Sequence, residues 1–200
     1  MTLLGAIDDA TSEVIALHFR PTEDLHGYAT LLQQVFTTVG VPVALYGDGV
    51  NILVRTDRHW TLAEQLAGTQ APTHLGRVLQ ELGMGYVQAR SPQGKGRVER
   101  RWGTLQDRLV SELRLRAVTT RAAANAFLPE FLADFNRRFA WPPAQPQAFG
   151  ARDQGLPASR KLLSIGCSRR TELQGLWDRV SQAAPHPRGL PLGGHRCSGN

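Results

Sequence analysis

The stretch SPQGKGRVERRWGTLQDRLVSEL, residues 91–113, combines chain breakers, a basic cluster and a long helical pattern. Its first six residues include a proline and two glycines, which indicate a loop. Apolar side chains then recur every three or four residues, as they do on one face of an α-helix. These side chains are Val98, Trp102, Leu105, Leu109 and Leu113. The stretch therefore predicts a breaker-rich loop followed by an amphipathic helix that packs on a core.

Glu99 lies in the first turns of this predicted helix, among the four cations Lys95, Arg97, Arg100 and Arg101. One interpretation is a solvated glutamate that complements the positive end of the helix dipole. The other is a metal-binding carboxylate whose basic neighbours hold an anionic substrate. The helix alone favours the first interpretation, and a second acid elsewhere in the chain would strengthen the other.

Asp48 is that second acid. It follows the apolar run VPVALY, residues 41–46, which has the length of a buried strand. Acids just past the carboxyl end of a buried strand lie where α/β sheets place their sites. A Gly-Asp-Gly turn without chemistry is the alternative, because glycines flank Asp48 on both sides.

The remaining pattern predicts an α/β fold with alternating strands and helices. Apolar runs predict strands at residues 3–7, 14–19, 41–46 and 84–89. Capping residues predict helices that begin after Thr22, Thr61, Thr73 and Thr119 or Thr120. The segment 55–72, which includes the Thr61 capping box, is an excursion between two of these elements.

Charge and composition limit the class of protein. The chain has 200 residues, a net charge of +6 and a pI near 10.1, which suggest a polyanionic partner. Most of the excess charge lies beyond Gly150. The two cysteines, Cys167 and Cys197, lack metal-ligand spacing, and we expect them to be reduced. Because the chain lacks a membrane-length apolar run and a signal-peptide pattern, we expect a soluble intracellular protein.

Five segments resemble a known family when they are taken in order. They are GAIDDAT (5–11), ALYGD (44–48), QGKGRVER (93–100), WGTLQDRLVSELR (102–114) and FLADFNRRF (131–139). Over roughly residues 2–145 the chain resembles the integrase catalytic core of DDE transposases, and more closely the ISNCY-type insertion-sequence transposases. The resemblance implies a ribonuclease H-like (retroviral integrase-like) mixed sheet with flanking helices, and a role in DNA transposition.

The resemblance also implies roles for the residues introduced above. Asp48 matches the second acid of the family's triad and Glu99 the third, and both would hold Mg²⁺ or Mn²⁺. Lys95, Arg97, Arg100 and Arg101 would contact DNA phosphates, and Gly94 and Gly96 would let backbone amides approach the strand. The expected partners are insertion-sequence ends, target DNA and a second copy of the chain. The expected location is the bacterial cytoplasm, in association with the nucleoid.

The first acid of the triad is absent from the expected place. In this family it lies on a middle strand that precedes the GAIDDAT strand, whereas the chain begins at Met1 almost directly at GAIDDAT. We therefore expect a transposase shortened at its amino end, with an unpaired sheet edge and impaired catalysis. A non-catalytic DNA-binding or partner-binding remnant is the alternative. A third possibility is a nuclease that takes its missing acid from Asp8 or Asp9.

Composition divides the chain near residue 145. Residues 1–145 would form the incomplete catalytic-core domain, and residues 146–200 a Gly-, Pro- and Arg-rich tail with little order. Only residues 162–165 and 173–180 hint at structure in the tail. One hypothesis is that the tail is read out of the ancestral frame, and the alternative is a basic extension that binds nucleic acid.

Overall fold

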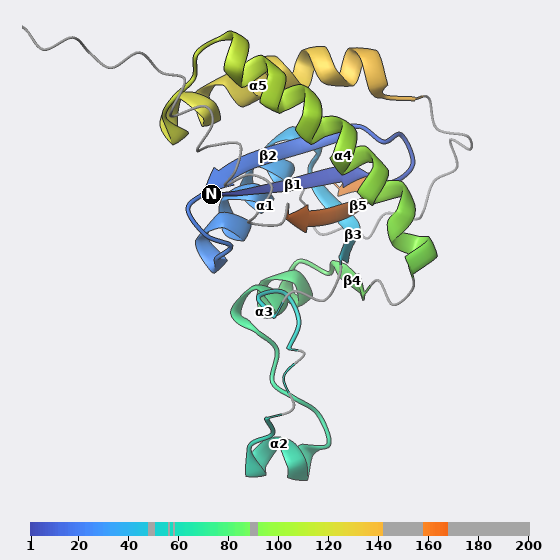
Figure 1. Cartoon of the computed structure of the whole chain (residues 1–200). Coiled ribbons are helices and arrows are strands. Elements are labelled where there is room, and N and C mark those ends of the chain that lie inside the picture. The colour runs from blue at the N-terminus through green and yellow to red at the C-terminus, as the bar shows by residue number, and fades with distance from the viewer. Residues whose placement is uncertain (48–50, 56, 58, 89–91, 142–157, 168–200) are drawn as a thin grey trace, which may run out of the picture.

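The computed structural model describes residues 1–47, 51–55, 57, 59–88, 92–141 and 158–167, and the side chains of residues 92–98 and 158–161 lie outside this description. Within these ranges the chain forms a mixed sheet of five strands with helices on both faces (Figure 1). The α/β class predicted from the sequence is confirmed.

The sheet has the order β2-β1-β5-β3-β4. Its strands are β1 (Thr2–Asp8), β2 (Val14–Arg20), β3 (Val41–Gly47), β4 (Gly85–Gln88) and β5 (Ala158–Cys167). β1 and β2 form an antiparallel hairpin, and β4 lies parallel to β3. β5 is antiparallel to β1 on one side and parallel to β3 on the other. The first four strands match the predicted ones to within two residues at each end.

β5 corrects two expectations. It belongs to the segment predicted to be a poorly ordered tail, yet it occupies the middle of the sheet. Ala6 of β1 pairs with Ile165, and Leu45 of β3 pairs with Leu163. The strand edges that were expected to be unpaired, on β1 and β3, are therefore both paired with β5. The physical reason is an apolar alternation, because Leu163 and Ile165 are buried on the same face of the sheet. The other tail residues lie outside the described ranges, and the domain division remains a prediction.

Different helices cover the two faces of the sheet: α1 (Leu25–Val39) and α3 (His74–Glu81) lie on one face, and α4 (Pro92–Leu115) and α5 (Arg121–Phe139) lie on the other (Figure 1). On the first face, the buried Tyr28, Leu31 and Val35 of α1 join side chains from β1, β3 and β5. α3 adds Leu75 and Leu79 to this cluster.

The second core lies between α4, α5 and the β1–β2 hairpin. The predicted apolar stripe of α4 is confirmed at Trp102 and at the buried leucines 105, 109 and 113. Phe131 and Phe135 of α5 stack at 5.6 Å between ring centroids. α4 begins at Pro92, so the predicted loop before Glu99 is helical instead. Proline suits the first helical position, and the long apolar stripe offsets the cost of about 1 kcal/mol for each glycine.

Two asparagines of α5 bind the backbone of the edge strand β2. Val14 N–H donates to Asn136 Oδ1 at 2.9 Å, and Asn136 Nδ2 donates to Val14 O at 2.8 Å. Asn125 makes the same pair with Phe19, at 2.8 Å and 3.2 Å. Since an edge strand exposes unpaired backbone groups, these amides complete the hydrogen bonding of β2 from outside the sheet.

Residues 55–73, which we call the arm, project away from the sheet, with α2 (Leu62–Ala67) at their far end (Figure 1). The predicted Thr61 capping box is present, with Glu64 as its acidic member. The Glu64 carboxylate also accepts from Ala71 N at 2.9 Å and pairs with Arg55 Nη1 at 2.5 Å. Polar contacts to Glu64 therefore connect the two sides of the arm.

The order of the arm should depend on pH through Glu64. Backbone hydrogen bonds from Thr61 and Ala71 are the main cause that lowers the pKa of Glu64 from 4.5 to about 2. A carboxylate with a depressed pKa stabilises the fold above its unfolded pKa and loses that effect as pH falls through the folded value. We therefore expect the Ala71 amide resonance to lose its folded position as pH falls from 4.5 towards about 2.

The matched variants for this test are Glu64→Gln and Glu81→Gln. Glu64→Gln should shift the Ala71 amide resonance at neutral pH and remove its acid transition. Glu81 is exposed on α3, and its replacement should leave both unchanged. An acid transition that persists in Glu64→Gln would show that another group controls the arm.

Candidate metal and nucleic-acid site

β3 leads the chain to the proposed site. It ends at Gly47, and the next residue, Asp48, lies outside the described ranges. A Cβ atom on Gly47 would lie 3.3 Å from Ile165 O of β5 and 2.9 Å from the Tyr86 hydroxyl of β4. The residue before Asp48 is therefore held closely between the two neighbouring strands.

Trp102 fixes α4 on the middle of the sheet. Its side chain is buried and lies over Gly5 and Gly166, which pair with each other across β1 and β5. A Cβ atom on Gly5 would lie 2.8 Å from Trp102 Cη2, and one on Gly166 would lie 3.0 Å from Trp102 Nε1. The indole ring thus occupies the space that side chains at these two positions would need.

Glu99 is exposed and lies one helical turn before Trp102. At 100° per residue, it is rotated by about 60° from Trp102, which puts it at the margin of the side of α4 that faces the sheet. Arg100 is exposed and rotated by about 160°, towards solvent. Arg101 is half-buried, and desolvation lowers the pKa of its guanidinium. The backbones of Lys95 and Arg97 are helical, and their side chains lie outside the described set.

The segments that carry the two predicted acids approach each other at β5. Gly47 packs against the carbonyl of Ile165, and the next residue of β5, Gly166, contacts Trp102. Glu99 follows one turn away along α4. The structure therefore places Gly47, the residue before Asp48, and Trp102, one turn after Glu99, against consecutive residues of β5.

Asp8 and Asp9 do not join Glu99. The Asp8 carboxylate is buried and accepts from Ala10 N at 3.2 Å and Thr11 Oγ1 at 2.8 Å, within its own turn. Side chains alternate along β1, and Gly5 faces Trp102, so Asp8 lies on the opposite face of the sheet, towards α1. Asp9 is exposed at the turn. The described residues contain no group of three His, Cys, Asp or Glu that could hold a metal ion.

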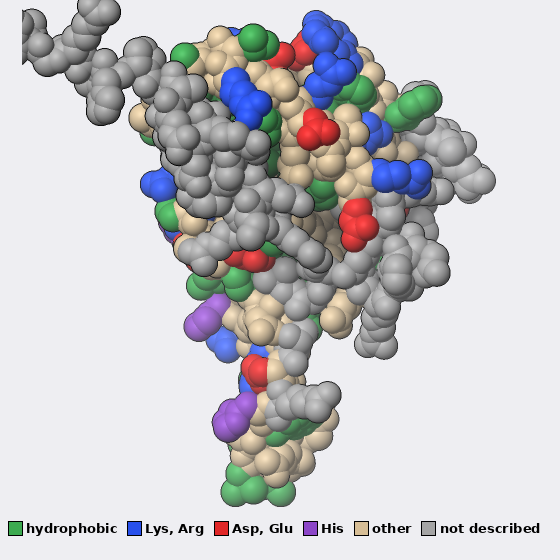
Figure 2. Space-filling view, in the orientation of Figure 1, with side chains coloured by type: hydrophobic (Ala, Val, Ile, Leu, Met, Phe, Trp, Pro, Cys, Tyr) green, Lys and Arg blue, Asp and Glu red, His purple; other side chains and the backbone are tan. Residues whose placement is uncertain are grey.

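Lys and Arg side chains alternate with Asp and Glu over α4 and α5 (Figure 2). Several of these charges are paired: Arg116 contacts Glu130 at 2.7 Å, and Arg138 contacts Asp134 at 2.9 Å. By contrast, residues 92–101 contain four cations and the single acid Glu99. By sequence, the amino-terminal half of α4 is therefore the most basic part of this helix, which suits a polyanionic partner.

Ser164 is a feature of this region that sequence reasoning missed. It pairs with Tyr46 in the sheet, its side chain is 1% exposed, and its hydroxyl finds no hydrogen-bond partner in the described part of the chain. A serine within a Gly- and Arg-rich tail carries no signal of burial, so its position could be found only from the pairing of β5. In the same described part, no helix is both long and apolar enough to cross a membrane.

Sequence comparison connects the chain with transposases. It is 40% identical over 145 residues to "Putative transposase y4bF" of Sinorhizobium fredii. This alignment covers 72% of this chain and 30% of that protein. It is 31% identical over 139 residues to "Transposase for insertion sequence IS1202" of Streptococcus pneumoniae. This alignment covers 67% of this chain and 28% of that protein. No family model and no solved structure matches. The chain spans less than a third of the length of these curated relatives, and over that span it is related by sequence to a segment of bacterial transposases.

Proposed function

We propose that the chain acts in DNA transposition, as a catalytic-core-type segment that binds DNA and a divalent cation. The names of its two relatives support the role in transposition. The observation that supports the site proposal is that Gly47, next to Asp48, and Trp102, one turn after Glu99, lie against consecutive residues of β5. The proposal requires the Asp48 side chain to face α4, as does its neighbour two residues earlier, Tyr46.

We also propose that the fold is of the ribonuclease H-like type. In that arrangement β5 takes the middle position that the family resemblance assigns to a first strand. The support is the sheet itself, in which the middle strand runs antiparallel to β1 and parallel to β3. In this proposal the central strand comes last in the described chain instead of first.

The proposed cation ligands are the carboxylates of Asp48 and Glu99. Carboxylate oxygens are the ligands that Mg²⁺ and Mn²⁺ prefer, and a bound cation would supply positive charge at a DNA phosphodiester. The described residues offer Glu99 alone of this pair, and the sequence of β5, ASRKLLSIGC, contains no acid. Within the described residues no third acid joins Glu99, and we propose that catalysis by this segment is weak.

The cations near Glu99 would hold the DNA. Arg100 points to solvent, and Lys95 and Arg97 belong to the same helical segment. Contacts between such side chains and phosphates are sensitive to salt and carry little sequence information. The chain should therefore bind duplex DNA with modest sequence preference.

Cation binding should depend on both acids. We expect Asp48→Asn and Glu99→Gln each to weaken Mn²⁺ binding, measured by electron paramagnetic resonance, by about tenfold or more, which is about 1.4 kcal/mol. Asp107→Asn is the matched control, because Asp107 is an exposed acid on the same helix, two turns further along. Equal Mn²⁺ affinity in all three variants would contradict the proposed site.

A non-catalytic DNA-binding remnant is the second candidate. It is favoured by the absence of a three-ligand metal group in the described part of the chain. Nicking of supercoiled plasmid in the presence of Mn²⁺ separates the two candidates. DNA binding without Mn²⁺ uptake or nicking would support the remnant, whereas robust nicking would contradict the expected weak catalysis.

A further inference from the structure

The far end of the arm exposes large apolar side chains. Leu62 is 72% exposed and Leu66 is 82% exposed. They are four residues apart in α2 and therefore lie on the same side of the helix. Trp60, at the entry to α2, is 39% exposed. Hydrophobic side chains accordingly gather at the end of the arm in the space-filling view (Figure 2).

The arm presents this apolar end on a structure that is already ordered. Arg55 Nη2 donates to His59 O at 2.7 Å, and Gln70 Nε2 donates to the same carbonyl at 3.1 Å. Glu64 connects α2 with Ala71 on the returning side. A preformed contact surface loses little conformational entropy on binding, which favours association.

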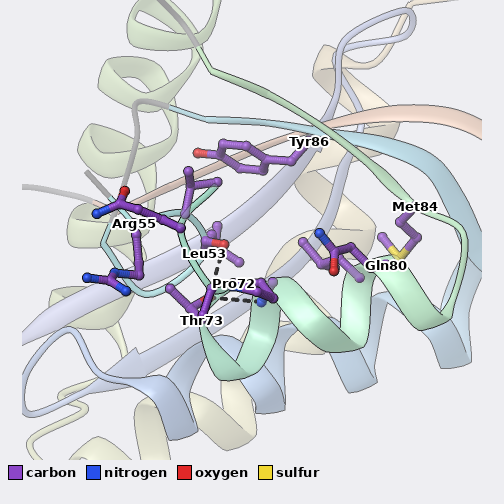
Figure 3. Close-up of a pocket in the computed structure, with 12 residues that line it drawn as sticks. Leu53, Arg55, Pro72, Thr73, Gln80, Met84 and Tyr86 are labelled. Atoms are coloured by element: carbon purple, nitrogen blue, oxygen red, sulfur yellow. Dashed lines mark hydrogen bonds between the residues drawn. The ribbon is translucent and has the colours of Figure 1, made fainter. Parts of the chain in front are cut away.

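A pocket with apolar and polar walls lies at the other end of the arm, where it joins the body (Figure 3), and its polar walls come from Arg55, Gln70, Thr73 and Gln80. Its volume is about 470 Å³. Leu53, Leu79, Met84 and Tyr86 supply apolar walls, and Tyr86 lies across the pocket from Pro72. This volume is within the range of roughly 300–1,000 Å³ that is typical of ligand pockets.

We propose that two copies of the chain exchange their arms, so that Leu62 and Leu66 of each copy enter the pocket of the other. The pocket is lined by residues at the base of the arm, including Arg55 and Pro72, whereas α2 lies at the far end of the arm (Figure 1). A twofold axis across the middle of two antiparallel arms would put each apolar end at the partner's pocket. Such an interface is isologous and closed, because each copy gives and receives the same contact.

A second copy explains the surface better than a nucleic acid does. Residues 59–73 contain no lysine or arginine, so the end of the arm offers no cation to a phosphate backbone. Both halves of an apolar contact, the leucines and the pocket, are present on one chain. The proposal goes beyond the proposed function, because it involves neither the cation nor DNA.

The first experiment is sedimentation equilibrium of the full 200-residue chain without DNA or added metal. We expect a monomer–dimer equilibrium whose dissociation constant rises by roughly a hundredfold or more in Leu62→Asn/Leu66→Asn. Leu115→Asn is the matched control, because Leu115 is 81% exposed at the end of α4, outside the arm and the pocket. A chain that stays monomeric, or a dimer that is equally stable in both variants, would overturn the proposal.

The second experiment tests which surfaces meet. In a background with Cys167→Ser and Cys197→Ser, one preparation carries Leu66→Cys and another carries Gln80→Cys, at an exposed residue that lines the pocket. We expect disulfide-linked dimers in the mixture and little linkage in either preparation alone. Equal linkage in Leu66→Cys alone would indicate contact between two arm ends, and linkage only after duplex DNA is added would indicate assembly on nucleic acid. Either result would overturn the arm exchange, and neither bears on Mn²⁺ binding by Asp48 and Glu99.

Discussion

Leu163→Asp should leave the chain without a cooperative unfolding transition. Leu163 has no exposed surface and lies in the middle strand, where it pairs with Asp8 on one side and Leu45 on the other. An unpaired carboxylate at such a position costs several kcal/mol, against a total stability of about 5–15 kcal/mol for a typical domain. Without β5 the sheet separates into two pairs of strands, neither of which buries enough apolar surface to fold alone.

The measurement is urea denaturation followed by circular dichroism. Leu162→Asp is the matched control, because Leu162 precedes Leu163 in the same strand but is 39% exposed. It should unfold cooperatively, near the midpoint of the parent chain. A chain that ends after Trp141 should behave like Leu163→Asp, because it lacks β5 entirely. A cooperative transition in Leu163→Asp near the parental midpoint would show that β5 is dispensable.

Trp102→Ala should lower the free energy of unfolding by about 3–5 kcal/mol, as is usual when a large buried aromatic side chain is removed. The ring is 8% exposed and contacts two glycines, and glycines have no side chain that could move into the cavity. The same ring holds α4, which carries Glu99 one turn earlier, on the sheet. Under the proposed function, Trp102→Ala therefore also weakens Mn²⁺ binding at urea concentrations where the variant remains folded.

Trp141→Ala provides the control for this second prediction, because Trp141 is 68% exposed at the end of α5. It should change the free energy of unfolding by no more than about 0.5 kcal/mol. If Trp102→Ala proves as stable as Trp141→Ala, the contact of the ring with Gly5 and Gly166 does not hold α4 on the sheet.

The local sequence pattern was sufficient to predict most of the helices and strands. The leucines of α4 recur at helical spacing, and the Thr61 and Thr73 caps lie at the predicted residues. α1 begins later than predicted, because Asp24 rather than Thr22 caps it by accepting from Gly27 N. In each case the deciding interactions lie within a few residues of one another.

The middle strand and the arm could not be found in this way. β5 pairs with β1 and β3, which are more than a hundred residues away in sequence, and the Gly-, Pro- and Arg-rich composition of the tail around it is typical of a loop. The sequence predicted an excursion at the arm, but its projection from the body depends on the contacts among Arg55, Glu64 and Ala71. For the candidate site, the sequence named Asp48 and Glu99, and the approach of their segments depends on the contact between Trp102 and Gly166.

The asparagines of α5 make the two edges of the sheet unequal in their ability to pair with another polypeptide. Asn136 and Asn125 already occupy the backbone groups of Val14 and Phe19, so an incoming extended peptide cannot form a ladder there. The opposite margin is the short strand β4, whose Val87 is 49% exposed. Addition of a strand from another polypeptide, and cross-β aggregation, should therefore start at β4.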